Sequence, residues 1–388
     1  MLKKIGYQLL GTLVLRGGFF IAFLLAIQLF SAQEIASFGL MLLISNSFST
    51  CIAMSFGVEC RNNIVEQGSI AFLNIKYFIS ALIATSFFSY LLYSYLDTLK
   101  IISVENYLIN FLLINVLIYL QQIIYGYELI KENSKINLVV GVGWLTLILL
   151  FFPKEINCFV MFYNLMILFQ ILFIIFILFR KISVKAGLVS FDFIGNYIVY
   201  AAFGLPVFMV AQLIIERYAS VEVLAKIVVL TQITNLIGFF NTQIIAILYN
   251  KLIKVNSLIG LNSVVNNFKM LNYLFICGLF FSFFFKDYIE SYLKQEWIGF
   301  FVNMMVFCLT SYYWVYNEFL LAKRKAKFVR ECNIIFGLVF ILLLVLFYVI
   351  VKSVDIYMYI FSLLIARMLA IFLAKKAIRI YFYENING

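Results

Sequence analysis

The sequence has no histidine, few charged residues and no paired cysteines. The absence of histidine excludes histidine general bases and histidine metal ligands. Charged residues make up 12% of the chain and hydrophobic residues 65%, and the mean hydropathy is +1.05. These values lie far outside the range of soluble globular domains. The chain is therefore predicted to lie mostly within a membrane.

Further absences limit the chemistry. No G-x-x-x-x-G-K-[ST] phosphate loop occurs, so the chain is not expected to power any work by hydrolysing ATP itself. The six cysteines are scattered and form no C-x-x-C pair, so they are interpreted as small apolar residues. No cofactor and no metal site is predicted. The loops are too short to hold an extramembrane catalytic domain.

Twelve apolar stretches fill nearly the whole chain. A helix needs about 20 apolar residues to cross a bilayer, and only helices satisfy their own backbone in lipid at this density. The fold is therefore predicted to be an all-α membrane bundle of about twelve transmembrane helices. The predicted spans are residues 9–30, 35–58, 70–96, 105–130, 136–152, 156–179, 191–215, 221–249, 268–288, 297–322, 331–351 and 354–376.

The distribution of Lys and Arg predicts the orientation. With the N-terminus in the cytoplasm, most of the 29 Lys and Arg residues fall in cytoplasmic segments, as the positive-inside rule requires. Both termini are therefore predicted to be cytoplasmic. The first stretch is interpreted as a retained helix and not as a signal peptide, because it is long and carries Arg16. The net charge of +11 then reports topology, and no nucleic-acid partner is predicted.

Polar residues recur at helical spacing in the first, second, fourth, seventh, eighth and tenth spans. Such stripes are typical of hydrogen bonds between membrane helices. Their recurrence at the same ordinal places in both halves favours instead one polar cavity, shared by two six-helix lobes of residues 1–187 and 188–388. Asn46, Gln232 and Asn235 are predicted to contact substrate in this cavity.

Four segments carry a resemblance to a known superfamily. They are LFSAQEIASFGL from Leu29 to Leu40, FGVECR from Phe56 to Arg61, ERY from Glu216 to Tyr218 and AKRKAK from Ala322 to Lys327. With these segments and its twelve spans, the chain resembles the multidrug, oligosaccharidyl-lipid and polysaccharide exporter superfamily, which includes the MATE transporters. Within it, the chain is similar to the Wzx-type flippases of O-antigen and capsular polysaccharide.

The resemblance implies two six-helix lobes around a central cavity that opens alternately to each side. It implies a transporter of the bacterial cytoplasmic membrane, not an enzyme, that moves an undecaprenyl-pyrophosphate-linked oligosaccharide. The implied partners are this lipid-linked oligosaccharide, membrane lipids and a glycan polymerase.

Cationic residues within or beside the spans fit a pyrophosphate substrate, because buried cations in lipid need anionic company and guanidinium groups bind phosphate through two parallel hydrogen bonds. Arg16 and Arg61 are the favoured phosphate ligands and match cationic positions of related lipid flippases. The full set of predicted cationic substrate ligands is Arg16, Arg61, Lys76, Arg217 and Arg367.

Apart from Arg16, each of these cations can also be explained by a structural role without substrate binding. Arg61 is explained equally well as the mark of a helix end, and Lys76 as a side chain that snorkels to the interface. Arg367 is also explained by pairing with a neighbouring helix or a lipid headgroup. Arg217 is also explained by an ion pair with Glu216.

Transport without ATP requires an ion gradient or the substrate's own gradient. Glu318 and Glu128 lie near the cytoplasmic ends of the tenth and fourth predicted spans, and they are the predicted sites for coupling to H⁺ or Na⁺. The alternative is that each carboxylate only pairs with nearby lysines.

Two other functions remain open. A drug or other small-molecule exporter of the same superfamily would need an acidic cavity for cationic substrates, and the basic residues within the spans argue against it. A membrane polysaccharide polymerase is expected to carry a large arginine-bearing outer loop, which this chain lacks.

Overall fold

The structure is a computed structural model of the 388-residue chain. It describes residues 2–387 except 180, 186, 188, 219, 232, 235–240, 242–251, 253, 254, 294, 295, 324, 353 and 354. Within this described part, eleven helical stretches are long and apolar enough to cross a membrane. The predicted all-α membrane fold is thereby confirmed. The eighth predicted span, residues 221–249, lies partly outside the described residues.

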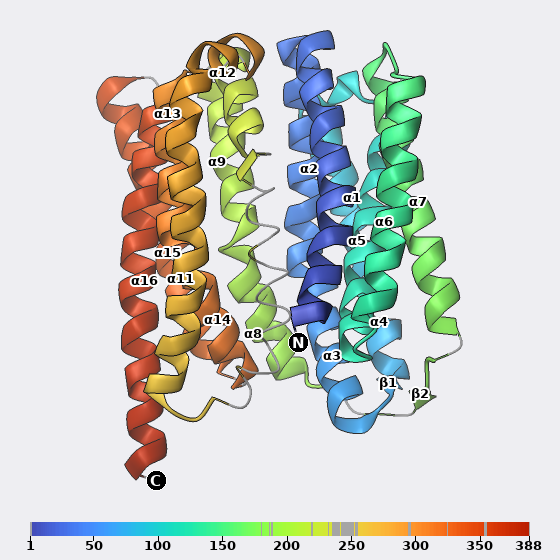
Figure 1. The fold of residues 1–388 in the computed structure, drawn as a ribbon, viewed down its shortest axis with the longest axis vertical. Coiled ribbons are helices and arrows are strands. Elements are labelled where there is room, and N and C mark those ends of the chain that lie inside the picture. Colours follow the sequence, from blue (N-terminus) through green and yellow to red (C-terminus); the bar gives the residue numbers. More distant parts are fainter. Residues whose placement is uncertain are drawn as a thin grey trace. The chain divides into compact units, whose positions relative to one another are not determined.

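The chain forms two compact units, Met1–Met209 and Val210–Gly388, and each is a bundle of long helices (Figure 1). The lobe boundary predicted at residue 187 stays a prediction. The first unit contains α1 (Leu2–Leu29), α2 (Ala32–Cys51), α3 (Ala53–Gln67), β1 (Ile70–Ala71), α4 (Phe72–Tyr95), η1 (Asp97–Ile101), α5 (Val104–Gly126), α6 (Ile130–Leu150), α7 (Ile156–Phe179), β2 (Val184–Lys185) and α8 (Phe191–Ala202). Helix α9 (Leu205–Tyr218) crosses into the second unit.

Small residues bring α1 and α6 close together. A Cβ added to Gly141 would lie 2.6 Å from the Cα atom of Leu15, and one added to Gly11 would lie 2.4 Å from the carbonyl oxygen of Ser134. Close backbone approach at small residues is a common basis of helix association in membranes. These two glycines therefore fix the tight packing of α1 on α6.

Helices α2 and α3 together form one long span, Ala32–Gln67. Ser31 begins it with a capping box, in which its hydroxyl accepts from the Glu34 backbone N–H and the Glu34 side chain accepts from the Ser31 backbone N–H. The regular helix is interrupted at Ile52. The sequence predicted an end at residue 58, so the observed helix runs nine residues further and ends at a left-handed glycine, Gly68.

Helix α5 is the centre of the first unit, and it packs against α2, α3, α4 and α7. Asn110 joins three helices, because its Oδ1 atom accepts from Ser45 Oγ at 3.0 Å and its Nδ2 atom donates to Asn164 Oδ1 at 2.8 Å. Nine residues further along α5, the Tyr119 hydroxyl donates to Asn74 Oδ1 on α4 at 2.9 Å. Several polar side chains buried in this unit are thus paired between helices, which lowers the cost of burying them.

A short parallel pairing ties the segment after α7 to the end of α3. Ile70 pairs with Val184 and Ala71 with Lys185, and the Ile70 N–H donates to the Ser183 carbonyl at 2.8 Å. Helix α8 begins six residues later and packs against α2 and α3. The segment that follows α7 is therefore held beside the C-terminal end of α3.

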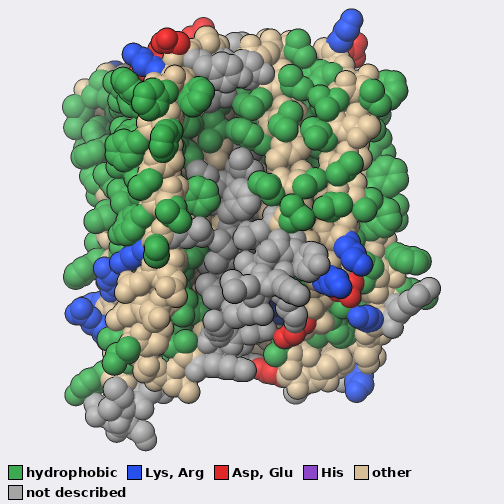
Figure 2. Space-filling model, in the orientation of Figure 1, with side chains coloured by type: hydrophobic (Ala, Val, Ile, Leu, Met, Phe, Trp, Pro, Cys, Tyr) green, Lys and Arg blue, Asp and Glu red, His purple; other side chains and the backbone are tan. Residues whose placement is uncertain are grey.

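The described helices of the second unit are α11 (Leu258–Phe281), η2 (Ser282–Phe285), α12 (Lys286–Leu293), α13 (Trp297–Thr310), α14 (Tyr313–Ala322), α15 (Ala326–Val351) and α16 (Ile356–Asn387). Helices α13 and α14 form one span with a turn at residues 311–312. Helix α13 packs against α11 and α16, and α14 packs against α15 and α16. On the side of this unit seen in Figure 2, hydrophobic side chains cover the upper part and Lys and Arg side chains gather lower down.

Candidate functional site

Arg61 lies within helix α3 and not at its end, because α3 continues to Gln67. The residue is only 8% exposed, and its guanidinium carbon lies 5.6 Å from the centre of the Tyr125 ring of α5. A guanidinium at this distance from an aromatic face gains cation–π stabilisation. The structure therefore corrects the alternative in which Arg61 marks a helix end, and it leaves a buried cation.

Arg16 lies on α1 and is half-buried. It interacts electrostatically with Tyr163 of α7 and with Tyr125 of α5. Tyr125 therefore lies against the Arg61 guanidinium and within electrostatic range of Arg16. The structure places both arginines, which are far apart in sequence, in the first unit.

Glu59 is a buried acid that the sequence reasoning missed. It is 6% exposed, lies two residues before Arg61 on α3, and its Oε1 atom accepts a hydrogen bond from the Ser190 backbone N–H at 3.0 Å. Ser190 in turn caps α8, because its hydroxyl accepts from the Phe193 N–H at 3.4 Å. The signal was present in the segment FGVECR, but the predicted span stopped one residue before Glu59.

The polar stripe of the fourth predicted span is largely used within the bundle. Asn115 donates to the Phe111 carbonyl of its own helix at 2.8 Å, and Gln122 donates to Met54 Sδ at 3.2 Å. Asn46 on α2 is half-buried, and its carbonyl accepts from the Ser49 and Thr50 hydroxyls. The stripe residues on α5 thus serve helix contacts, whereas the role of Asn46 in binding stays a prediction.

Lys76 and Arg217 are exposed. Lys76 lies on α4 near its start, two residues after the inward-facing Asn74, so it points to another side of the helix. Arg217 lies in the last turn of α9, where a positive charge interacts favourably with the negative end of the helix dipole. The binding roles of Lys76 and Arg217 stay predictions, and the side chain of Glu216 lies outside the described residues.

Arg367 lies on α16 in the second unit and is half-buried. Its Nη1 atom donates to Thr310 Oγ1 at 3.0 Å, and its guanidinium carbon lies 5.3 Å from the centre of the Phe307 ring. Both partners belong to α13. Arg367 therefore sits against a neighbouring helix within the bundle, as one of the sequence alternatives proposed.

The two predicted coupling acids occupy different kinds of position. Glu128 is exposed in the turn between α5 and α6, with a left-handed φ of 55°. Glu318 is half-buried inside α14. Beyond the end of α14, Lys323 Nζ donates to Asn256 Oδ1 at 3.0 Å, and partial burial lowers the pKa of this lysine.

Gln232 and Asn235, the substrate contacts predicted on the eighth span, lie outside the described residues.

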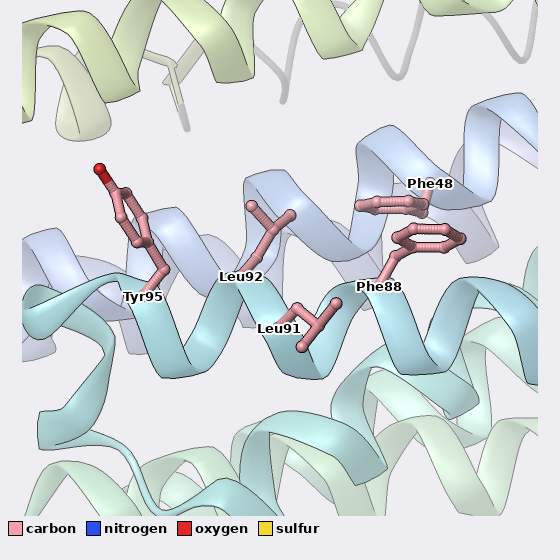
Figure 3. A pocket seen from close by; sticks show the side chains of 5 residues that line it. All are labelled: Phe48, Phe88, Leu91, Leu92 and Tyr95. Atoms are coloured by element: carbon pink, nitrogen blue, oxygen red, sulfur yellow. The ribbon is translucent and has the colours of Figure 1, made fainter.

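An apolar groove of about 550 Å³ lies on the first unit between α2 and α4 (Figure 3). Its lining residues are Phe48, Phe88, Leu91, Leu92 and Tyr95. Phe48 comes from α2 and the other four from α4. Because these residues carry no charge, the groove suits a hydrocarbon chain and not a phosphate group.

Solved structures share this arrangement of helices. An outward-facing multidrug resistance MATE family transporter of the MOP superfamily matches with a TM-score of 0.70 and 11% sequence identity, over 98% of this chain and 96% of that chain. The chain has the fold of a MATE transporter. An inward-facing multidrug resistance MATE family transporter also matches nearly the whole chain. Its TM-score is 0.65 and its sequence identity 11%, over 97% of this chain and 95% of that chain.

A third structure with the MATE fold is the transporter ClbM in complex with Rb⁺. It has a TM-score of 0.57 and 12% identity over 97% of this chain and 93% of that chain. At such low identity the likeness is one of fold. No protein-family model and no curated protein sequence matches the chain.

Proposed function

We propose that this protein is a flippase that moves an oligosaccharide, linked to undecaprenyl pyrophosphate, across the bacterial cytoplasmic membrane. The observation that carries the proposal is the presence of two arginines within the membrane-spanning helices of the first unit. Arg61 is buried against the Tyr125 ring, and Arg16 lies on α1 within electrostatic range of the same tyrosine. The planar guanidinium group of arginine binds phosphate oxygens through two parallel hydrogen bonds, so arginines at a membrane-embedded site match the anionic headgroup of a pyrophosphate lipid.

The mechanism we propose is alternating access. The solved proteins with this fold include one described as inward-facing and one as outward-facing. In the present chain, Arg16 and Arg61 belong to the first unit and Arg367 to the second. A diphosphate held by such cations has its charge compensated, which a bilayer interior otherwise makes very costly.

Coupling to H⁺ or Na⁺ remains part of the proposal. One solved protein of this fold is described with Rb⁺ bound, which supports ion binding by such a bundle. The acids proposed for this task in the present chain are Glu318 and Glu128. The structure adds Glu59, because it is the buried acid that holds the start of α8.

The setting follows from the same proposal. The chain would lie in the bacterial cytoplasmic membrane with both termini in the cytoplasm, where its basic loops fall. Its partners would be the lipid-linked oligosaccharide, membrane lipids and a polymerase that receives the exported unit. Lys76, Arg217, Asn46, Gln232 and Asn235 stay in the proposed binding set, although the structure gives the exposed Lys76 and Arg217 less support than the arginine pair.

The test is a flipping assay with the purified protein in liposomes. Fluorescent oligosaccharide on undecaprenyl pyrophosphate is placed in one leaflet, and its appearance in the other is followed with a membrane-impermeant quencher. We expect protein-dependent transfer that an Arg16→Ala variant loses. Protein-free rates with the parent protein, in liposomes where the protein is folded and inserted, would contradict the proposal.

A second function is favoured by the comparisons. Two of the matching structures are described as multidrug resistance transporters, so export of a drug or another small molecule is the alternative. The same liposomes loaded with ethidium distinguish the two. Gradient-driven efflux of this cation without lipid transfer would support the drug exporter.

A further inference from the structure

Tyr312 of the second unit is approached by two lysines from different helices. Lys269 of α11 has its ammonium nitrogen 4.5 Å from the centre of the Tyr312 ring, and Lys375 of α16 has its nitrogen 5.8 Å from the same centre. Tyr312 itself lies in the turn between α13 and α14. Three separate parts of the fold therefore place two positive charges at one aromatic ring.

This arrangement places like charges close together. Because both distances end on one ring, the two ammonium groups lie no farther apart than the sum of those distances. Two cations at such a separation repel each other, most strongly where lipid or protein replaces water. A cation–π contact at a partly exposed site is weak, so one tyrosine ring compensates the repulsion only in part.

No described carboxylate forms an ion pair with either lysine. Helices α11 and α13 contain no acidic residue, and the one acid of α16 is Glu384. Glu318 of α14 lies six residues after Tyr312, which is about 240° further round a helix. The described ion pairs thus leave the two lysines open to a bound anion.

The surroundings suit a phosphate. Lysine ammonium groups and tyrosine hydroxyls donate hydrogen bonds to phosphate oxygens, and the Tyr312 hydroxyl has no hydrogen-bond partner among the described residues. Lys269 and Tyr312 are half-buried and Lys375 is exposed, so the three side chains remain reachable. The sequence did not single out Lys269, because the ninth span was predicted to start at residue 268, whereas α11 begins ten residues earlier.

Two cations follow each other along α16. Lys375 lies eight residues before the end of the apolar stretch Ile356–Tyr383, which corresponds to about 12 Å along a helix. Arg367 lies eight residues before Lys375 and bonds to Thr310, two residues before Tyr312. Along α16 the lysine pair and Arg367 thus form successive cationic positions at increasing depth.

We infer that Lys269, Tyr312 and Lys375 form an anion site that binds the diphosphate headgroup of a polyprenyl lipid before the headgroup reaches Arg367. The assignment to the carrier lipid rests on the proposed function. The site itself rests on the two lysines at one ring. Ordinary phospholipid carries the same phosphate chemistry, so the test has to separate these two sources.

The experiment measures equilibrium binding to the full-length protein in nanodiscs of phosphatidylcholine. Undecaprenyl pyrophosphate is titrated in one arm and phosphatidylglycerol in the other. We expect Lys269→Gln/Lys375→Gln to bind undecaprenyl pyrophosphate at least about tenfold more weakly than the parent, because the variant lacks two charge-assisted hydrogen bonds to the headgroup. Tyr312→Phe keeps the ring and should show a smaller loss.

The matched control is Lys376→Gln/Arg379→Gln, which removes two exposed charges from the same helix and should keep the parent affinity. Lys375→Gln alone, at an exposed position, serves if the double variant fails to fold. Equal affinity of the parent and the Lys269/Lys375 variant would overturn the site, as would an equal loss in the control. A loss confined to phosphatidylglycerol would overturn the assignment to the carrier lipid.

Binding and flipping give separate answers. If the parent binds undecaprenyl pyrophosphate at this site but does not flip its glycan-linked form, the flippase proposal fails and the anion site stands. If the parent flips the lipid while the Lys269/Lys375 variant binds it normally, the flippase proposal stands and the anion site fails.

Discussion

Glu59 accepts a hydrogen bond from the Ser190 backbone N–H at 3.0 Å, and this bond joins the interior of α3 to the start of α8. The acceptor is a buried carboxylate and the donor belongs to a helix N-terminus, where a negative charge is favourable. The bond therefore weakens if Glu59 takes up a proton. This dependence makes Glu59 a candidate for linking ion binding to the position of α8.

The first prediction tests this link with two variants. Glu59→Ala removes the acceptor and should increase amide hydrogen exchange in the first turn of α8, because a hydrogen bond to a charged group contributes about 1.5–3 kcal/mol. Glu59→Gln keeps an acceptor oxygen and should keep that turn protected, but it should make transport less sensitive to pH. Parent-like exchange in Glu59→Ala would show that α8 is held by other contacts.

The second prediction concerns Arg61. Arg61→Ala should lower lipid flipping at least about tenfold, and Arg61→Lys should restore only part of it, because an ammonium group lacks the planar fork of a guanidinium. The control is Lys135→Ala, which removes an exposed cation of α6 in the same unit and should flip at close to the parent rate. The flipping assay in liposomes measures all three. A larger loss in Lys135→Ala than in Arg61→Ala would contradict the role drawn from the burial of Arg61.

Much of the fold was predictable because spans in lipid must be long, apolar and helical. The residue at which α3 ends was not predictable from hydropathy. Glu59, Arg61 and Asn63 make residues 59–67 look like a polar loop in the sequence, yet the structure buries all three side chains. Their partners, such as Ser190 and Tyr125, come from distant segments, and hydropathy contains no information about such partners.

The candidate site shows the same limit. Helical spacing identified the face of α5 that carries Asn115 and Gln122, but it could not show that these side chains bond to α5 itself and to Met54. Asn110, which joins three helices, was not singled out at all. Arg16 was found because a cation in a span is costly enough to stand out alone, whereas the burial of Arg61 against the Tyr125 ring required the fold.

The third prediction concerns the packing of α1 on α6. Gly141→Ala should destabilise the protein, because the new Cβ would meet the Leu15 backbone at 2.6 Å and overpacking typically costs about 1–3 kcal/mol. Gly143→Ala is the matched control on the same helix, since no atom lies within 4 Å of its added Cβ. It should be neutral or slightly stabilising. Thermal melting of the purified proteins in detergent measures both, and equal melting temperatures would argue against close contact at Gly141.

The fourth prediction separates the coupling role of Glu318 from a structural role. Glu318 is half-buried in α14, within the span Trp297–Ala322. Glu318→Gln keeps nearly the same shape and hydrogen-bonding reach, but the amide cannot release a proton or offer a cation a full negative charge. The variant should therefore bind undecaprenyl pyrophosphate like the parent while its flipping rate loses its response to an imposed pH or Na⁺ gradient. Glu155→Gln is the control, because Glu155 is exposed between two spans and its variant should keep the parent response. Gradient-imposed flipping in liposomes, measured beside equilibrium binding in nanodiscs, gives both quantities for each variant. If Glu318→Gln responds to both gradients as the parent does, the carboxylate is a structural partner within the bundle, and Glu59 becomes the buried acid to which coupling must be assigned.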